Sequence, residues 1–179
     1  AGAEIDCYCA DITRTFPVSG RFSGRQKALY EIVLEAQLAG IAAVSPGASF
    51  NDPHEAAVRA ITAGLKDLKL LKGSVDSLIE KTAYRKFFVH RTSHWLGLDV
   101  HDVGEYRVGD TWRMLEPGMV LTIEPGIYVP AHRNIPKQWH GIGIRIEDDV
   151  LVTRQGHDVL TQDAPKDPAA IETLMASGS

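Results

Sequence analysis

Cysteine is nearly absent from this chain. Only Cys7 and Cys9 occur among its 179 residues, and a single tyrosine separates them. A disulfide between residues so close in sequence is strained, and a thiolate zinc site would need further soft ligands. We therefore expect two reduced structural thiols and no disulfide framework, which fits a cytoplasmic protein.

The chain also lacks long apolar runs and clusters of basic residues. Its apolar stretches are interrupted every few residues, which argues against a transmembrane helix. It opens without the basic and apolar regions of a secretory signal. The net charge of −4 argues against a nucleic-acid-binding surface. Hydrophobic residues make up 44% of the chain, enough for a sizeable core, so we expect one domain.

The first half of the chain has mainly helical patterns. Helices are expected over residues 24–44, from 51–52 to 68, and over 74–82. Pro46 and Gly47 end the first helix, Pro53 lies in the first turn of the second, and Ser74 caps the third.

Strand patterns dominate elsewhere. Strands are expected within residues 3–16 and over 87–90, 119–129 and 141–153. The last of these alternates cleanly, so Arg145 and Glu147 share the face opposite Ile144 and Ile146.

The end of the chain is more polar. We expect residues 1–162 to form the domain and residues 163–179 a polar C-terminal tail. A short helix is expected within residues 168–176, and the final MASGS is expected to be disordered.

Four separated acid and imidazole groups carry the chemistry. They are Asp11 in DITRTFP, His94 in HRTSHWLGLDVHD, Glu124 in LTIEPGIY and Glu147 in GIGIRIEDD. Carboxylates flanked by apolar residues are costly to bury without a partner. A bound divalent cation would compensate all four groups together, which makes a hydrolytic metal site the first hypothesis.

Each of these residues also has an ordinary structural explanation. Asp11 would face water on an edge strand, and His94 would be a satisfied core histidine. Glu124 would cap a turn, and Glu147 would form a cross-strand salt bridge. The four explanations together require independent coincidences, so the joint pattern favours the site. The spacing of His90 and His94 does not form an HExxH motif and is weak support for any particular zinc site.

The ligand types narrow the chemistry. Oxygen ligands with a single imidazole suit Mn, Co, Fe or Zn better than a thiolate zinc site would. Carboxylates can bridge two ions about 3.5–4 Å apart, and a hydroxide between such ions is a nucleophile at neutral pH. This chemistry requires neither a serine nor a cysteine nucleophile.

At these residues the sequence resembles the metal-dependent "pita-bread" peptidases, most closely the Xaa-Pro aminopeptidases. The motifs DITRTFP, SHWLGLDVHDVG, LEPGMVLTIEPGIY and GIGIRIEDD carry the resemblance, which runs from residue 1 to about 160. It implies an α/β (α+β) pita-bread fold, with a curved antiparallel sheet backed by helices. It also implies removal of the N-terminal residue from peptides with proline second, and a pair of divalent ions, usually manganese.

The resemblance assigns the metal ligands residue by residue. Asp11 and Glu147 match the bridging carboxylates, and His94 and Glu124 match ligands of one ion. Thr13 is expected to hydrogen-bond near the metals.

The same resemblance implies catalytic roles for a second set of residues. His90 and His101 would hold the substrate and stabilise the developing negative charge. Arg145 would shape the proline pocket, and Glu124 would also transfer a proton.

Two departures from the family pattern stand out. His90 is followed by Arg91 where the family has glycine, and this long cation would narrow the approach or point to solvent. The family also has an Asp ligand eleven residues before the match to Asp11, which falls just ahead of Ala1. We therefore expect the start of the fold to be missing and the second metal site to be weakened. We also expect a complementing N-terminal fragment or a homo-oligomer to cover the exposed sheet edge.

Several alternatives stay open. An Xaa-Pro dipeptidase is a close variant, although the short segment between His101 and Glu116 favours the aminopeptidase. Methionine aminopeptidase and creatinase-type proteins fit the motifs less well. An inactive peptide-binding module would explain the absent Asp, but it would not need to keep four buried charged groups.

Overall fold

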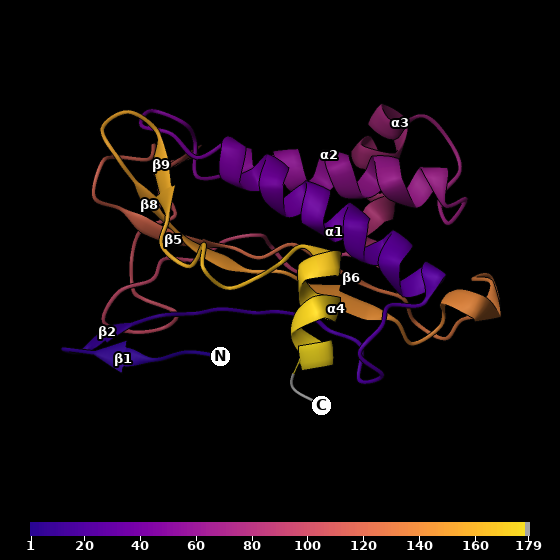
Figure 1. Ribbon diagram of the computed structural model, residues 1–179. Helices are drawn as coiled ribbons and strands as arrows, with labels where there is room; N and C mark the ends of the chain where they lie inside the picture. The colour runs from indigo at the N-terminus through magenta and orange to yellow at the C-terminus, as the bar shows by residue number, and fades with distance from the viewer. Residues whose placement is uncertain (178–179) are drawn as a thin grey trace.

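The computed structural model describes residues 1–177, in which helices cover one side of a set of antiparallel strands (Figure 1). In chain order the elements are β1 (Glu4–Ile5), β2 (Tyr8–Cys9), α1 (Gly24–Ala42), α2 (Asp52–Asp67), α3 (Val75–Glu80), the 3-10 helix η1 (Ala83–Lys86), β3 (Arg107–Val108), β4 (Thr111–Trp112), β5 (Val120–Ile123), β6 (Gly126–Tyr128), the 3-10 helix η2 (Lys137–Trp139), β7 (Gly143–Arg145), β8 (Asp148–Val152), β9 (His157–Val159) and α4 (Pro168–Ser177). The predicted mixed architecture, with antiparallel strands backed by helices, is confirmed.

Helices α1 and α2 form the main helical layer, and both lie where the sequence predicts them. Helix α1 begins with a capping box, in which Ser23 Oγ accepts from Gln26 N and Gln26 Oε1 accepts from Ser23 N. The two helices approach closely at Gly64 of α2, where an added Cβ would lie 2.5 Å from Cγ1 of Ile32. Only a glycine fits this contact without a shift of the neighbouring helix.

The central strands form one long antiparallel ribbon with a break in its middle. Strand β5 pairs with β8 and β6 pairs with β7, and Ile123–Asp148 and Gly126–Arg145 are matched in the same register. Glu124 therefore lies opposite Glu147 at the break. Pro125, which has no N–H to donate, interrupts the ladder there.

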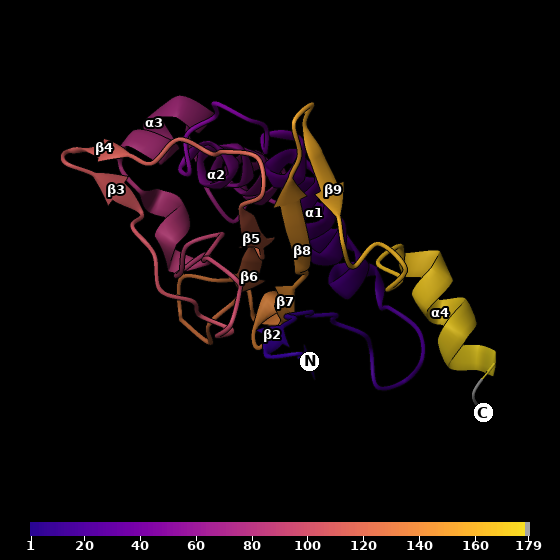
Figure 2. The same cartoon turned by 90° about the vertical axis from the view of Figure 1, so that its left-hand side faces the viewer.

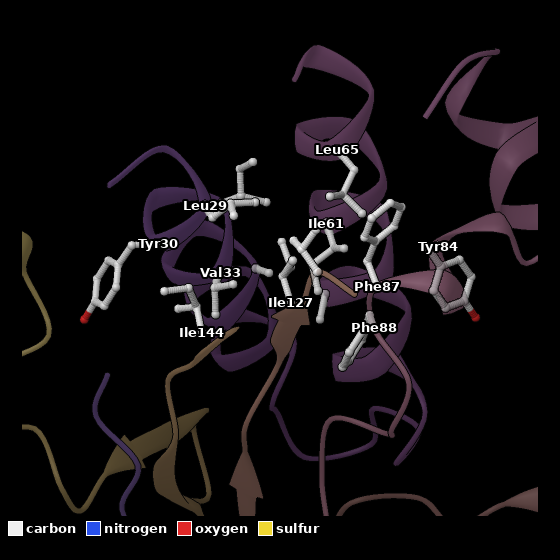
Figure 3. Packing of buried hydrophobic residues seen from close by; sticks show 14 of the residues in the cluster. Leu29, Tyr30, Val33, Ile61, Leu65, Tyr84, Phe87, Phe88, Ile127 and Ile144 are labelled. Carbon is white, nitrogen blue, oxygen red and sulfur yellow. The ribbon is translucent and has the colours of Figure 1, made fainter. Parts of the chain in front are cut away.

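Two hydrophobic clusters stabilise the fold. The larger one joins α1 and α2 to the β6–β7 end of the ribbon, and Figure 3 shows Val33, Ile61, Phe87, Ile127 and Ile144 packed together in it. The second packs Phe50 and Trp95 against the β5–β8 end. The ribbon is thus held at both ends, and its break lies between the two clusters.

Some strand predictions were wrong in detail. Residues 87–90 form no strand, because Phe87 N and Phe88 N both donate to Tyr84 O in the turn that ends η1. Residues 3–16 hold only the two-residue strands β1 and β2. The single strands predicted over 119–129 and 141–153 are each divided at the break.

The cysteines and the tail also depart from expectation in part. Both cysteines are free, as predicted, but Cys7 is exposed at the turn of the β1–β2 hairpin. Helix α4 continues to Ser177 where disorder was expected, and residues 178–179 lie outside the described part. No helix within residues 1–177 is long and apolar enough to cross a membrane.

Candidate metal centre

Four neighbouring extended segments meet at the break in the ribbon, and each carries one of the predicted ligands. Glu124 N donates to Thr92 O at 2.8 Å, which places the His94 segment beside β5. On the other edge, Glu147 N donates to Thr13 O at 3.1 Å, which places the Asp11 segment beside β8. The pairing of distant segments therefore brings Asp11, His94, Glu124 and Glu147 to one place.

His94 lies at the centre of this group. Its Nε2 is 3.7 Å from Asp11 Oδ2 and 3.5 Å from Glu124 Oε1. His94, Glu124 and Glu147 offer ligand atoms within 4.8 Å of one another, and so do Asp11, His94 and His101. Two overlapping sets that share one imidazole could hold one ion or two.

The imidazole of His94 is fixed in orientation. Its Nδ1 donates to Trp95 O at 2.9 Å, so the lone pair is on Nε2. The backbone N of His94 donates to Thr122 Oγ1 at 3.2 Å. Among the described residues, Nε2 is buried without a hydrogen-bond partner. A buried lone pair aimed at two carboxylates is what a divalent cation would satisfy, so these residues fit a metal.

The ionised forms of two carboxylates in this group are disfavoured by their surroundings. Burial, with the neighbouring Glu147 carboxylate, raises the pKa of Glu124 to about 8. Burial likewise raises the pKa of Glu147, against the effect of its hydrogen bond from Thr13. A cation would reverse both effects because it favours the ionised form of its ligands.

Two further residues support the carboxylates. Thr13 Oγ1 donates to Glu147 Oε2 at 2.5 Å, which holds one carboxylate of the candidate centre in place. Asp149 Oδ2 accepts from the backbone N of Asp11 at 3.1 Å, and burial raises the pKa of Asp149 to about 6. Asp149 is a supporting residue that the sequence reasoning missed, although it follows Glu147 by two positions on the same face of the strand.

A hydrogen-bonded chain of three side chains borders the group. Arg145 Nε donates to Tyr128 Oη at 2.8 Å, and Tyr128 Oη lies 2.8 Å from His90 Nε2. His90 Nδ1 donates to Arg91 O at 2.6 Å, so its Nε2 accepts the tyrosine proton. Burial lowers the pKa of His90, which disfavours the protonated ring. Arg145 Nη1 also lies 3.7 Å from Glu124 Oε2, which connects the chain to the acidic group.

Tyr128 is the second residue that the sequence reasoning missed as part of the site. It lies four residues after Glu124, within the strand predicted over residues 119–129. The sequence did indicate that Tyr128 faces the same side as Glu124, because residues 124, 126 and 128 of an extended segment face one side.

His101 and Arg91 lie at the margin of the candidate metal centre. His101 is exposed, and its ring lies 4.4 Å from that of His94 in an edge-on arrangement. Arg91 turns away from His90, donates to Asn51 Oδ1 and stacks over Trp112. The two alternatives for Arg91 were narrowing the approach to the site or pointing to solvent, and the structure shows an exposed residue whose guanidinium is held by Asn51 and Trp112.

The chain is similar to known proteins over most of its length. Residues 1–154 match the family described as metallopeptidase family M24. The chain is 52% identical over 175 residues to an Xaa-Pro aminopeptidase of Haemophilus influenzae and 50% identical over 177 residues to one of Escherichia coli. These alignments cover 98% and 99% of this chain and 40% of each relative.

A solved structure is similar as well. Aminopeptidase PepP of Pseudomonas aeruginosa superposes with a TM-score of 0.95 at 61% identity, covering 97% of this chain and 40% of that one. The fold prediction is thereby confirmed. The chain spans about 40% of the length of the relatives that it matches.

Proposed function

Because the chain belongs to metallopeptidase family M24, we propose that the protein is a metal-dependent aminopeptidase acting on peptides with proline in second position. The observation that carries the metal-dependent part is the buried, unpartnered Nε2 of His94 between two carboxylates. The preference for proline is drawn from the names of the relatives, Xaa-Pro aminopeptidases.

Asp11, His94, Glu124 and Glu147 would hold the cofactor, which we propose to be two divalent ions, Mn²⁺. When bound, such ions supply a nucleophile from water at neutral pH and polarise the scissile carbonyl. Thr13 holds Glu147 in place through its hydroxyl, and Asp149 holds the backbone of Asp11.

The protein's own groups would handle the substrate and the proton. We assign to Glu124 the transfer of a proton from the attacking water to the departing proline nitrogen. Its Oε2 is oriented by Arg145, while its Oε1 faces His94. His90 and His101 would contact the substrate on either side of this carboxylate, and the Arg145–Tyr128–His90 chain would form one wall of the proline pocket.

The test compares cleavage of Ala-Pro-Ala and Ala-Ala-Ala by the purified protein with Mn²⁺ or with a chelator, and mass spectrometry identifies the products. Release of alanine from the proline peptide alone, and only with metal, is expected. Glu147→Gln should reduce this activity by at least about a hundredfold, whereas Glu80→Gln, an exposed control on α3, should not. The absence of both bound metal and cleavage of either peptide would support the peptide-binding module instead.

A further inference from the structure

A cavity lined in part by Arg91 and Ser93, which neighbour His90 and His94 in sequence, differs in character from the candidate metal centre. It measures about 430 Å³ and is lined by Phe50, Arg91, Ser93, Tyr106, Arg107 and Trp112. Two guanidinium groups and no carboxylate contribute to its walls. The metal-centre residues line no part of it, so it is a separate site.

Both arginines of this cavity lack an anionic partner. Arg107 and Trp112 are cross-strand partners in the β3–β4 hairpin (Figure 2), and the guanidinium lies 4.1 Å from the indole ring centroid. Arg91 lies 4.5 Å from the same ring and otherwise donates to the neutral Asn51. Within residues 1–177, neither arginine forms an ion pair. Glu55 reaches Arg91 only through Asn51, so the two cations held at one ring still attract an anion.

A neutral donor in the same cavity is also unsatisfied. Ser93 is one of the residues that line the cavity, and its Oγ is buried with no hydrogen-bond partner in the described chain. A buried hydroxyl without a partner is costly in a folded protein. A carboxylate oxygen would accept from this hydroxyl while its second oxygen faced a guanidinium.

The remaining walls are aromatic. Phe50 contacts Tyr106 and Trp112, with ring centroids 5.0 and 6.4 Å apart. Such walls suit the apolar part of a peptide better than they suit a free inorganic ion. The cavity therefore combines the two features of a peptide carboxylate, an anionic end and an apolar body.

Two residues that line the cavity are adjacent in sequence to histidines of the candidate site. Arg91 directly follows His90, whose ring belongs to the wall proposed for the proline pocket. Ser93 directly precedes His94. Each residue of an extended peptide spans about 3.3–3.6 Å, so a group one to three residues beyond the proline is within reach of the cavity.

We propose that this cavity binds a carboxylate of the peptide substrate on the C-terminal side of the proline. The carboxylate would be the C-terminus of a short peptide or an acidic side chain of a longer one. The inference rests on the proposed aminopeptidase function and adds a preference for anionic substrates to it.

The experiment measures kcat/KM of the manganese-loaded full-length protein for two matched pairs of peptides. The first pair is Ala-Pro-Ala and its C-terminal amide, and the second is Ala-Pro-Asp amide and Ala-Pro-Asn amide. We expect the anionic member of at least one pair to be preferred about tenfold, and the preference to weaken with added salt. A preference in the first pair would show that the cavity binds the C-terminal carboxylate. A preference in the second pair would show that it binds an acidic side chain.

Arginine variants connect the preference to the cavity. In Arg91→Gln and Arg107→Gln the ratio within the preferred pair should fall towards one, whereas the exposed Arg154→Gln should leave both ratios unchanged. Equal rates within both pairs for the unmodified protein would overturn the proposal. A preference that survives both arginine changes would also overturn it, because the carboxylate would then bind elsewhere.

A binding measurement separates this proposal from the proposed function. Pro-Ala and Pro-Ala amide, which cannot be cleaved as Xaa-Pro substrates, are titrated while tryptophan fluorescence is followed. Tighter binding of the free acid, lost in Arg107→Gln, would support the cavity even if no peptide is hydrolysed. Equal binding of the two, with hydrolysis of Ala-Pro-Ala intact, would overturn the cavity and leave the aminopeptidase standing.

Discussion

At the scale of single residues, the candidate centre depends on side chains that are held before any ion arrives. Trp95 O fixes the tautomer of His94, and Thr13 occupies one oxygen of Glu147. Metal ligands that are oriented by hydrogen bonds lose less freedom on binding, so supporting groups affect affinity although they do not touch the ion.

Thr13 provides a direct test of this support. Thr13→Val keeps the shape of the side chain but removes the 2.5 Å hydrogen bond to Glu147 Oε2. We expect the affinity for Mn²⁺, measured by isothermal titration calorimetry, to fall about tenfold. Thr173→Val, on the exposed face of α4, should bind the ion as the unmodified protein does. Equal affinities in the two variants would mean that Thr13 does not orient the ligand.

His54 supports a prediction about pH and stability. Burial, together with Arg91 and Arg85, lowers the pKa of His54 to about 4, and its Nδ1 lies 2.8 Å from Thr92 Oγ1. Since the unfolded chain binds this proton near pH 6.5, the free energy of unfolding should fall as the pH drops from about 6.5 to about 4. The full loss from this group is at most about 3 kcal/mol.

Urea unfolding of the metal-free protein at several pH values measures the effect. His54→Asn keeps a hydrogen-bonding atom near Thr92 and should flatten the pH dependence within this window. His132→Asn alters an exposed histidine and serves as the control. A pH dependence that is the same in both variants would contradict the assignment to His54.

The sequence predicted which residues gather, but not what holds them. Polar residues in apolar surroundings indicated Asp11, His94, Glu124 and Glu147, and the structure brings them together, while their roles as ligands stay a prediction. Tyr128 and Asp149 escaped notice because each looks ordinary in its strand. Their significance comes from partners distant in sequence, Arg145 and Asp11, which local patterns do not reveal.

At the scale of elements, the helices followed local rules and the strands did not. Capping residues and apolar spacing placed α1 and α2 within two residues of their ends. The strands were predicted to be too long, because the alternation of apolar and polar residues continues through Glu124 and Glu147, where the hydrogen-bonded ladder breaks. Hydrogen bonding between distant segments decides where a strand ends, and alternation within one segment does not report it.

The segment before α4 joins the tail to the strands through one buried carboxylate. Asp148 is fully buried, and its oxygens accept from Arg14, Gln37 and Lys166 at 2.6–2.7 Å. Arg14 Nη1 also donates to Glu147 O at 2.6 Å. The tail thereby reaches the strand that carries a candidate ligand, although the sequence suggested only a polar extension.

Lys166→Met tests this connection. The change leaves the buried Asp148 carboxylate without one of its donors, and we expect the free energy of unfolding to fall by about 2 kcal/mol. The value is below that for a fully buried pair because the Lys166 side chain is 22% exposed and Arg14 remains. Lys137→Met, an exposed control, should change stability by less than about 0.5 kcal/mol in urea unfolding. Equal losses in the two variants would show that the tail is not held through Asp148.

At the scale of the whole molecule, the stable parts lie on either side of the candidate centre. One hydrophobic cluster holds the β6–β7 end of the ribbon and the other holds the β5–β8 end. Between them, Glu124 and Glu147 face each other where the ladder breaks. The carboxylates therefore oppose folding of the metal-free protein at a point that packing does not stabilise.

A bound cation should convert this weak point into a source of stability. An ion that binds only the folded chain, at a free concentration one hundred times its dissociation constant, adds about 2.7 kcal/mol. For a chain of this size, the melting temperature should rise by about 5–10 °C between chelator and Mn²⁺. Differential scanning calorimetry measures the shift directly.

Glu147→Gln separates metal binding from other effects of the ion. The variant replaces a buried charge with a neutral amide of similar shape, so without metal it should melt at or above the temperature of the unmodified protein. With Mn²⁺ it should gain little, because a ligand is lost. Glu80→Gln should keep the full shift. A shift of equal size in Glu147→Gln would place the ion elsewhere on the molecule, and the absence of any shift in the unmodified protein would remove the metal centre from the proposal altogether.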